Sequence, residues 1–357
     1  MVNSKININF ALVKYSRKSL DRAGWALLDP FKRAEVIEMV TDWRLSHLPV
    51  LRELVEDLTS YFRENNVQYA FYSQRIKRMT SIIDKLRNNQ ESKMGLGGMQ
   101  DIGGARFVFG SVDDLKLTQD ALSAFTPDHF TLERITDYIS NPKSSGYRSI
   151  HYIYKYHSEN PDYDGLKIEL QIRTRLQHSW AMAVETASLI SRTSLKANIN
   201  DGSVWRGFFK LVSAIFAIKE QSVIPEEYAN YNHQQYCEDF LDYVDKYKLL
   251  HQLKALRVTV VSDDVYLDKP DGFCVLSIDF KQQRVTYKTF LSEEESIAST
   301  IFSQLEQTID ADEAVLLVSI AKMQEIREAY PSYFLDTNEF LDSLEDFETS
   351  CSVYRKS

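Results

Sequence analysis

Hydrophobic residues recur at intervals of three and four along much of the first ninety residues, which is the spacing of helices with one buried face. Two such faces stand out, one within residues 48–58 and one within residues 76–86. They consist of Leu48, Leu51, Leu54, Val55 and Leu58, and of Ile76, Met79, Ile82, Ile83 and Leu86. We therefore expect residues 33–90 to be helical.

The hydrophobic period changes to two after a glycine-rich break at residues 95–98. Residues 105–109 and 151–156 have the composition of strands. Residues 167–173 alternate: Ile168, Leu170 and Ile172 would face a core, and Lys167, Glu169, Gln171 and Arg173 the opposite side. With helices expected over 112–124 and 176–189, the pattern predicts an α+β, or mixed α/β, fold in which helices flank a mixed sheet.

The second half of the chain has a different character. Helices are expected over 204–219 and 228–255, followed by short strands at 257–261, 273–280 and 284–291. A helix at 293–308, a strand at 314–319 and a last helical region at about 322–347 complete the pattern. We expect one domain over residues 1–255, with its core at about 40–190, and a C-terminal region over 256–357. That region would hold a β-rich module at about 256–307 and a helical tail at about 320–350.

The composition is that of a soluble globular protein, with 44% hydrophobic and 26% charged residues among 357. No apolar run approaches the ~20 residues of a membrane span, and the N-terminus lacks a secretory pattern. Three scattered cysteines have neither disulfide-like nor zinc-like spacing, which favours a reducing, cytoplasmic location. The net charge of −9 argues against a protein that coats DNA or other nucleic acid non-specifically.

Charge is unevenly distributed. Residues 75–87 hold five basic side chains and one acid, whereas residues 322–357 hold eight acids and four bases. A basic patch and an acidic tail could attract each other. On charge alone, two solvated helix faces are the better interpretation.

Two carboxylates at the ends of predicted strands, Asp101 and Glu169, form the type of pair that binds Mg²⁺ together with phosphate oxygens. Nearby basic residues could hold a polyphosphate. These are Arg75, Lys77, Lys85 and Arg106. Taken singly, each feature has a plainer explanation: a surface ion pair worth about 0–1 kcal/mol for Glu169, and a solvated basic helix for the cations.

Residues 141–151 read Asn-Pro-Lys-Ser-Ser-Gly-Tyr-Arg-Ser-Ile-His. Pro142 and Gly146 indicate a turn, from which Tyr147 could offer its ring to a nucleotide base. Lys143 and His151 could bind the sugar and phosphates. The alternative is that Tyr147 packs at the start of a strand.

These segments occur in an order that resembles the RelA/SpoT synthetase domain, over about residues 40–190. The resemblance implies an ATP-dependent pyrophosphokinase in which Asp101 and Glu169 carry Mg²⁺ and Glu169, Asp101 and Arg106 are catalytic. It implies ATP contacts for Arg75, Lys77, Ser81, Lys85 and Arg106. It implies acceptor contacts for Lys143, Tyr147, Arg148, His151, Gln171 and Arg173. None of the seven histidines is followed by Asp, so no hydrolase activity is expected.

Other segments are similar to the toxic small alarmone synthetase branch, and specifically to the CapRel group, in which a synthetase is fused to its own antitoxin. The segments are residues 183–187, Leu195-Lys196 and Trp205 with Phe208-Phe209, and Tyr330 and Tyr333 match a Tyr-x-x-Tyr tail. Ser145 stands where nucleotide-using synthetases usually carry Asn. This resemblance implies transfer to the 3′ CCA end of tRNA, autoinhibition through Tyr330 and Tyr333, and release by a phage protein such as a capsid protein. The β-rich module would correspond to a pseudo-zinc finger without structural zinc.

Two other functions stay open from the sequence. The acceptor could be free GDP, GTP or an adenine nucleotide, giving (p)ppGpp or (p)ppApp. The domain could also be an inactive binding module, although the presence of Asp101, Glu169, Arg75, Lys77 and Tyr147 argues against that.

Overall fold

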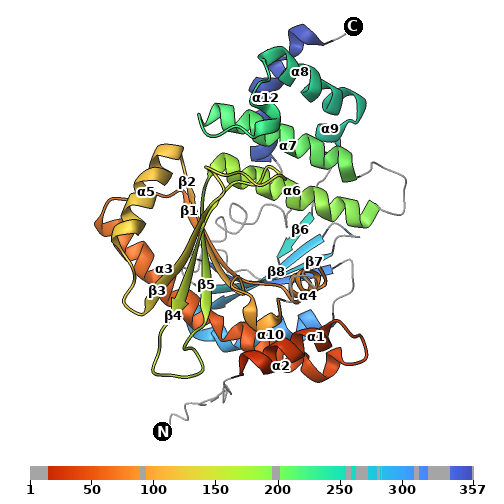
Figure 1. Ribbon diagram of the computed structural model, residues 1–357. Helices are drawn as coiled ribbons and strands as arrows, with labels where there is room; N and C mark the ends of the chain where they lie inside the picture. Colours follow the sequence, from red (N-terminus) through yellow and green to blue (C-terminus); the bar gives the residue numbers. More distant parts are fainter. Residues whose placement is uncertain are drawn as a thin grey trace.

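The computed structural model describes residues 15–88, 94–194, 202–254, 259–262, 272–279, 282, 284–308, 313–320 and 338–355. Within them, nine strands form one mixed sheet in the order β3-β4-β5-β2-β1-β9-β7-β8-β6 (Figure 1). The strands are β1 Phe71–Ile76, β2 Gly103–Phe109, β3 Phe130–Asp137, β4 Ile150–Tyr156, β5 Lys167–Thr174, β6 Thr259–Ser262, β7 Gly272–Asp279, β8 Arg284–Leu291 and β9 Glu313–Ile320.

The C-terminal strands extend the sheet of the N-terminal half. β9 pairs antiparallel with β1, with Gln74 opposite Ser319, and β7 pairs with the other side of β9. The boundary expected near residue 255 therefore separates two stretches of sequence that share one sheet. The division of the chain into two domains at residue 255 stays a prediction.

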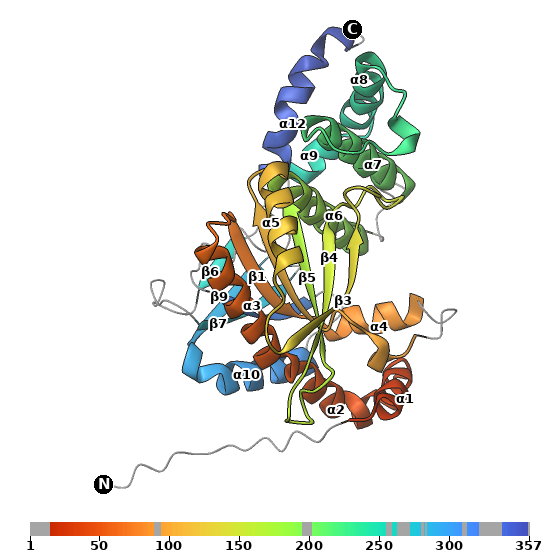
Figure 2. The same ribbon diagram turned by 60° about the vertical axis from the view of Figure 1, so that its left-hand side comes forward.

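The helices cover the sheet unequally (Figure 2). Those that the structure describes are α1 Arg17–Leu27, α2 Arg33–Leu45, α3 His47–Glu64, α4 Met79–Asn88, α5 Val112–Ala124, α6 Arg175–Ser194, α7 Gly202–Lys219, α8 His233–Leu241, α9 Leu249–Lys254, α10 Glu295–Thr308 and α12 Asn338–Ser350. Apolar residues of α3, α5 and α10 join those of the strands in a single core on one face. α6 and α7 pack together beyond the opposite face.

The alternation predicted for residues 167–173 is confirmed. Ile168, Leu170 and Ile172 are fully buried in that core, so Glu169 and Gln171 lie on the opposite face of β5. The expectation that residues 33–90 are helical is wrong at residues 71–76, which form β1. This segment is paired on both edges, with β2 and β9, and those pairings outweigh the local helical spacing that included Ile76.

Two further elements differ from expectation. The single helix expected over 228–255 is α8, a π-helical turn at Asp242–Lys246, and α9, with a break at Lys248, whose φ is 54°. Strand β3 has no counterpart in the prediction. Its residues are mostly half-buried or exposed because it lies at the edge of the sheet, so the hydrophobic pattern is weak there.

The end of the chain is anchored to α6, α7 and α8. Phe340, Leu341 and Leu344 of α12 are buried in a second hydrophobic cluster with those helices. Cys237 and Cys351 form a disulfide across 114 residues, which corrects the expectation that no pair of cysteines is placed to bond. Sequence spacing missed the pair because only the packing of α12 against α8 brings the two thiols together.

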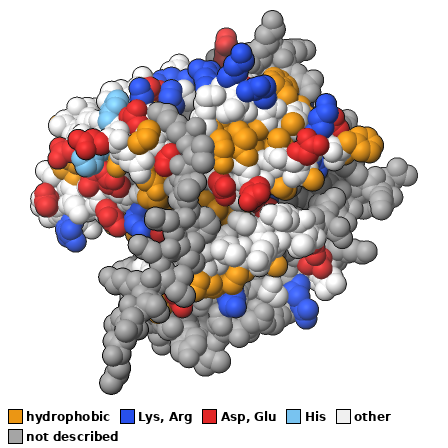
Figure 3. All heavy atoms as spheres, turned by 90° about the horizontal axis from the view of Figure 1, so that it is seen from below, with side chains coloured by type: hydrophobic (Ala, Val, Ile, Leu, Met, Phe, Trp, Pro, Cys, Tyr) orange, Lys and Arg blue, Asp and Glu red, His pale blue; other side chains and the backbone are white. Residues whose placement is uncertain are grey.

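On the face drawn in Figure 3, acidic and basic side chains are interspersed. None of the described helices has the length and apolar character needed to cross a membrane.

Candidate active site

A cavity of about 910 Å³ lies on the face of the sheet opposite α3 and α5. Strands β4 and β5, helices α6 and α7 and the loop before β4 contribute its walls. The lining residues are Lys85, Asp101, Arg134, Thr136, Tyr138, Lys143, Ser145, Tyr147, His151, Glu169, Gln171, Trp180, Val184, Ala187, Ser188, Trp205, Arg206 and Phe209.

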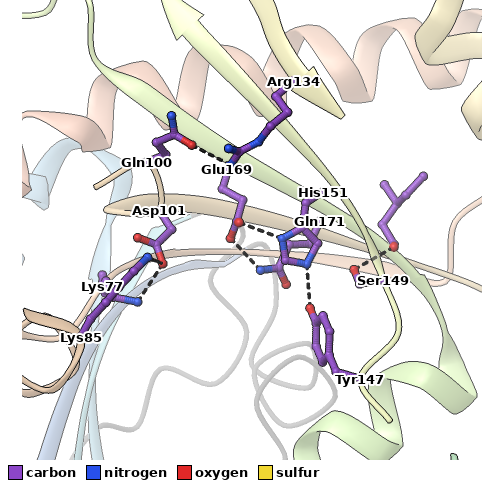
Figure 4. A network of polar contacts seen from close by, with 11 residues as sticks. Lys77, Lys85, Gln100, Asp101, Arg134, Tyr147, Ser149, His151, Glu169 and Gln171 are labelled. Carbon is purple, nitrogen blue, oxygen red and sulfur yellow. Dashed lines mark hydrogen bonds and ion pairs between the residues drawn. The ribbon is translucent and has the colours of Figure 1, made fainter. Parts of the chain in front are cut away.

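Asp101 lies at one end of the cavity, just before β2, between two lysines (Figure 4). Its Oδ2 accepts hydrogen bonds from Nζ of Lys77 and Nζ of Lys85, both at 2.9 Å. Burial opposes ionisation, but the two ammonium groups hold the pKa of Asp101 at about 2. Its other oxygen, Oδ1, is buried and has no hydrogen-bond partner among the described residues. The carboxylate is thus charged and fixed, with one oxygen that no described side chain bonds.

Glu169 lies in a chain of hydrogen bonds across β4 and β5 (Figure 4). Its Oε1 is 2.8 Å from Nδ1 of His151, and its Oε2 accepts from Nε2 of Gln171 at 2.7 Å. Nε2 of His151 is in turn 2.9 Å from the hydroxyl of Tyr147. Burial would raise the pKa of Glu169, but the bond from His151 outweighs it and the pKa is lowered. Glu169 is therefore a positioned, ionised carboxylate.

Gly104 keeps the surface beside Glu169 open. In the sheet, Gly104 is paired with Glu169 on β5 and with Arg75 on β1. A Cβ at this position would meet nothing closer than the carbonyl oxygen of Glu169, 3.7 Å away. The glycine leaves room for a ligand between a carboxylate and a guanidinium.

The two carboxylates suit Mg²⁺, which takes few protein ligands, better than a metal whose ligands all come from the protein. Among the residues that the structure describes, no group of three or more His, Cys, Asp or Glu side chains is placed to hold an ion. Mg²⁺ is commonly held by one or two carboxylates together with phosphate oxygens and water. Asp101, with its unpartnered buried oxygen, and Glu169 fit that description.

Arg173 is buried behind the cavity with a charge that is poorly compensated. Its Nε and Nη2 have no hydrogen-bond partner within the described part of the chain. Burial, with repulsion from Arg106, lowers its pKa well below the usual value. Arg75 adds to the repulsion. Two guanidinium groups therefore repel that of Arg173 and Glu185 attracts it, an environment that a bound phosphate would stabilise.

At the other end of the cavity, Lys143 lies against two tyrosine rings. Its Nζ is 4.2 Å from the ring centroid of Tyr138 and 5.1 Å from that of Tyr147. The ring of Tyr147 is also edge-on to His151, with centroids 5.7 Å apart. Aromatic faces and a cation together suit a nucleotide base and its phosphate.

Much of the predicted site converges, although Arg75, Arg106 and Arg173 are not among the residues that line the cavity. Lys85, Lys143, Tyr147, His151 and Gln171 line the same cavity as the two carboxylates, and Lys77 is joined to it through Asp101. Ser81 is in the first turn of α4 and is half-buried. Tyr330 and Tyr333 lie outside the described residues.

Arg148 departs from its predicted contact with the acceptor. It is 3% exposed and donates to Ser213, Ser222 and the carbonyl of Val223, at the buried side of the loop. Its position before β4 is what predicts a ligand contact. The structure instead shows it attaching the Tyr147 loop to α7 and the segment that follows it.

Part of the cavity wall consists of residues for which the sequence predicts no ligand contact. Arg134, which donates to Gln100 at 2.7 Å, and Tyr138 come from β3 and its end, an element that was not predicted. Trp205, Arg206 and Phe209 come from α7. The helical spacing of Trp205 and Phe209 does not separate a cavity wall from an ordinary core face.

Comparison with known proteins shows which part of the chain resembles them. Residues 74–190 match the family described as a region found in RelA / SpoT proteins. GTP pyrophosphokinase YjbM of Bacillus subtilis is 31% identical over 121 residues, which cover 34% of this chain and 56% of that protein. GTP pyrophosphokinase of Haemophilus influenzae is 28% identical over 155 residues, 42% of this chain and 19% of the relative.

Among solved structures, small alarmone synthetase 1 from Bacillus subtilis bound to its product pppGpp is similar, with 25% identity and a TM-score of 0.40. That match covers 50% of this chain and 92% of the other. The chain thus spans little more than half of the first curated relative, and α7 lies beyond the stretch that matches the family.

Proposed function

We propose that this protein is a Mg²⁺-dependent pyrophosphokinase that transfers the β,γ-diphosphate of ATP to a nucleotide or RNA hydroxyl. The observation that carries the proposal is that two ionised carboxylates, Asp101 and Glu169, line one cavity. Asp101 is held by Lys77 and Lys85, and Glu169 is joined through His151 to Tyr147. The match of residues 74–190 to the RelA/SpoT region supports the same chemistry.

In the proposed reaction, the acceptor hydroxyl oxygen attacks the β-phosphorus of ATP. A new P–O bond forms while the bond from that phosphorus to the oxygen shared with the α-phosphate breaks, and AMP leaves. Glu169, kept ionised by His151, accepts the hydroxyl proton. The bound metal would neutralise phosphate charge. Lys77, Lys85, Arg75 and Arg106 would fix the phosphates of ATP in line with the acceptor, which Arg173 would contact.

For the acceptor, we propose the 3′ end of tRNA. Four cationic side chains and two carboxylates line the cavity, a local excess of positive charge in a chain of net charge −9. Trp205, Arg206 and Phe209 extend the wall beyond the family match with rings and a cation that suit unpaired bases. Ser145, which replaces the Asn of nucleotide-using synthetases, lines the same cavity.

A free guanine nucleotide is the second candidate acceptor. The relatives from Bacillus subtilis and Haemophilus influenzae are GTP pyrophosphokinases by name. The family match over residues 74–190 includes Tyr147 and Glu169. With GDP or GTP as acceptor, the product would be a guanosine alarmone.

We further propose that the C-terminal region inhibits the enzyme and that a phage protein, such as a capsid protein, relieves the inhibition. The support is the resemblance of the tail to the CapRel group and the position of its neighbours. β9 ends beside β1, the strand of Arg75, and Glu339 of α12 lies 3.6 Å from Arg175 of α6. Replacing Tyr330 and Tyr333 together with Ala should make a tolerated chain inhibit growth. Unchanged growth, with a protein whose Glu169→Ala form is inactive in vitro, would remove this part.

One assay tests the chemistry and the acceptor. The purified chain, with and without the residues beyond 329, is incubated with Mg²⁺ and ATP labelled on its β- or γ-phosphate, together with tRNA or with GDP and GTP. Label on tRNA alone supports the first acceptor, and label on nucleotide alone supports the second. Absence of transfer to either, even after truncation, would remove the enzymatic proposal.

A further inference from the structure

Arg44 of α2 is a fully buried arginine whose partners come from α10, more than 250 residues further along the chain. Its Nη1 and Nη2 donate to the carboxylate of Glu306 at 2.5 and 3.1 Å. Its guanidinium carbon also lies 5.5 Å from the ring centroid of Phe302, one helical turn before Glu306. Neither charge is in contact with bulk water, since Arg44 is 0% exposed and the side chain of Glu306 only 7%.

The same two side chains hold the short connection between β1 and α4. Nε of Arg44 donates to the carbonyl of Lys77 at 2.9 Å, and the backbone N–H of Met79 donates to Oε1 of Glu306 at 3.0 Å. Met79 begins α4, so its N–H is one of those that a helix cannot satisfy internally. Glu306 thus caps α4 from a distant part of the chain.

That connection leads directly into the candidate phosphate site. The N–H of Lys77 donates to the carbonyl of Ile102, and its side chain donates to Asp101. Lys85, the other partner of Asp101, is on α4 itself. The position of both lysines therefore depends on where residues 77–79 are held.

We propose that Glu306, together with Arg44, is a positioning residue for the ATP site: the C-terminal region holds the β1–α4 connection in the geometry that places Lys77 and Lys85 on Asp101. The proposal rests on the proposed pyrophosphokinase function. It gives α10 a part in building the active site, separate from any inhibition by the tail.

The chain offers a matched control. Arg52 of α3 forms an ion pair with Glu295 at the start of α10, so it joins the same parts of the chain. Its side chain is 38% and that of Glu295 26% exposed, and neither makes a described hydrogen bond to residues 77–79. If activity falls only because α10 is held less firmly, then changing Arg44 and Glu306 or changing Arg52 and Glu295 should lower it equally.

The test compares the double variant Arg44→Met/Glu306→Met with Arg52→Met/Glu295→Met, in the full chain. Apolar residues of similar volume commonly replace a buried ion pair without loss of folding, but methionine cannot make the two bonds to residues 77–79. We expect kcat/KM for ATP to fall on the order of 10- to 100-fold in the first variant. The KM for the acceptor should be unchanged, and the control should stay close to the wild-type chain. Glu306→Gln, which keeps an oxygen for the Met79 N–H, should lie between.

A second measurement does not require catalysis. Hydrogen exchange of the amides in residues 79–85 should be faster in Arg44→Met/Glu306→Met than in the control, in folded protein with a cooperative thermal transition. Equal losses in the two double variants, or a folded variant with unchanged exchange and unchanged kcat/KM, would overturn the positioning role. If the wild-type chain transfers no label, the proposed function fails, while the exchange result still decides the positioning role.

Discussion

Nδ1 of His151 lies 2.8 Å from Oε1 of Glu169, while Nε2 of the same ring lies 2.9 Å from the hydroxyl of Tyr147. One imidazole thus connects the ring expected to bind the acceptor base with the carboxylate expected to take the acceptor proton. These contacts fix the orientation of the Tyr147 ring and of the Glu169 carboxylate. Substitutions at Tyr147 and at Glu169 can therefore test base binding and proton transfer one at a time.

Tyr147→Phe keeps the ring and loses the hydroxyl bonded to His151. We expect little change in KM for the acceptor and a severalfold fall in kcat. Tyr147→Leu also removes the stacking surface, worth about 1–3 kcal/mol per base, so KM for the acceptor should rise about 5- to 150-fold. The measurement is steady-state kinetics with tRNA and with GDP; equal KM values for the two variants would exclude stacking on Tyr147.

Glu169→Gln keeps the size and most hydrogen-bonding positions of the side chain but cannot accept the proton. General base catalysis contributes about 10²–10⁴-fold, so kcat should fall by that order. The thermal transition should stay near that of the wild-type chain, because Gln can still bond to His151 and Gln171. Retained kcat in a folded Glu169→Gln protein would assign the proton transfer to another group.

Arg173→Met should stabilise the protein in the absence of ligand. The substitution removes a buried guanidinium with unpartnered donors, a type of group that costs about 1–3 kcal/mol when left unsatisfied. The gain in Tm that GDP produces should become smaller, because a predicted contact with the acceptor is lost. Thermal unfolding with and without GDP measures both effects. A lower Tm of the ligand-free variant would mean that Arg173 is already compensated.

His47 makes stability depend on pH. It is fully buried beside Trp43, and burial lowers its pKa to about 4. The unfolded chain, with an ordinary pKa near 6.5, binds the proton first as pH falls. The stability that depends on neutral His47 is therefore fully present above pH 6.5 and is lost as the pH falls from 6.5 to 4. Below pH 4, His47 causes no further loss. The loss attributable to His47 is about 3 kcal/mol.

The check is denaturant unfolding of the wild-type chain and His47→Gln across that range. The variant should have a shallower dependence of the unfolding free energy on pH. An identical slope for the two proteins would show that His47 is not the group responsible.

The disulfide between Cys237 and Cys351 predicts a redox-dependent stability. Closing a loop across 114 residues typically stabilises a protein by about 2–4 kcal/mol. Reduction, or Cys351→Ser, should lower the unfolding free energy by that amount. Mass spectrometry of the untreated and reduced protein checks for the bond itself. The Cys351→Ser protein should show no further loss on reduction, and a further loss would point to a different pair.

The sequence anticipates the parts of the site whose residues are close along one strand or loop. The alternation of Glu169 and Gln171 on β5 predicts their shared face, and the turn before β4 predicts the position of Tyr147. It does not reveal that Lys77 and Lys85 share Asp101, since that depends on how α4 packs. The bond from Met79 to Glu306 spans 227 residues, and no local pattern encodes it.

β1 shows the same limit in the fold. The sequence pattern predicts helix for its residues because Ile76 continues a three- and four-residue spacing into α4. Only the pairing with β2 and β9, on two other parts of the chain, makes residues 71–76 a strand. Arg148 is the converse case: its sequence neighbours suggested a ligand contact, while burial against α7 gives it a structural role.

The pairing of β9 with β1 bears on how the chain can be divided. Without β9, the N–H and C=O groups on that side of β1 would be left open at the edge of the sheet, and such an edge readily recruits a strand from another molecule. A chain cut before residue 313 would therefore expose an unpaired, aggregation-prone edge on the strand that carries Arg75. If such a truncated chain self-associates or becomes insoluble, the effect on cells could be mistaken for toxicity or for release from inhibition.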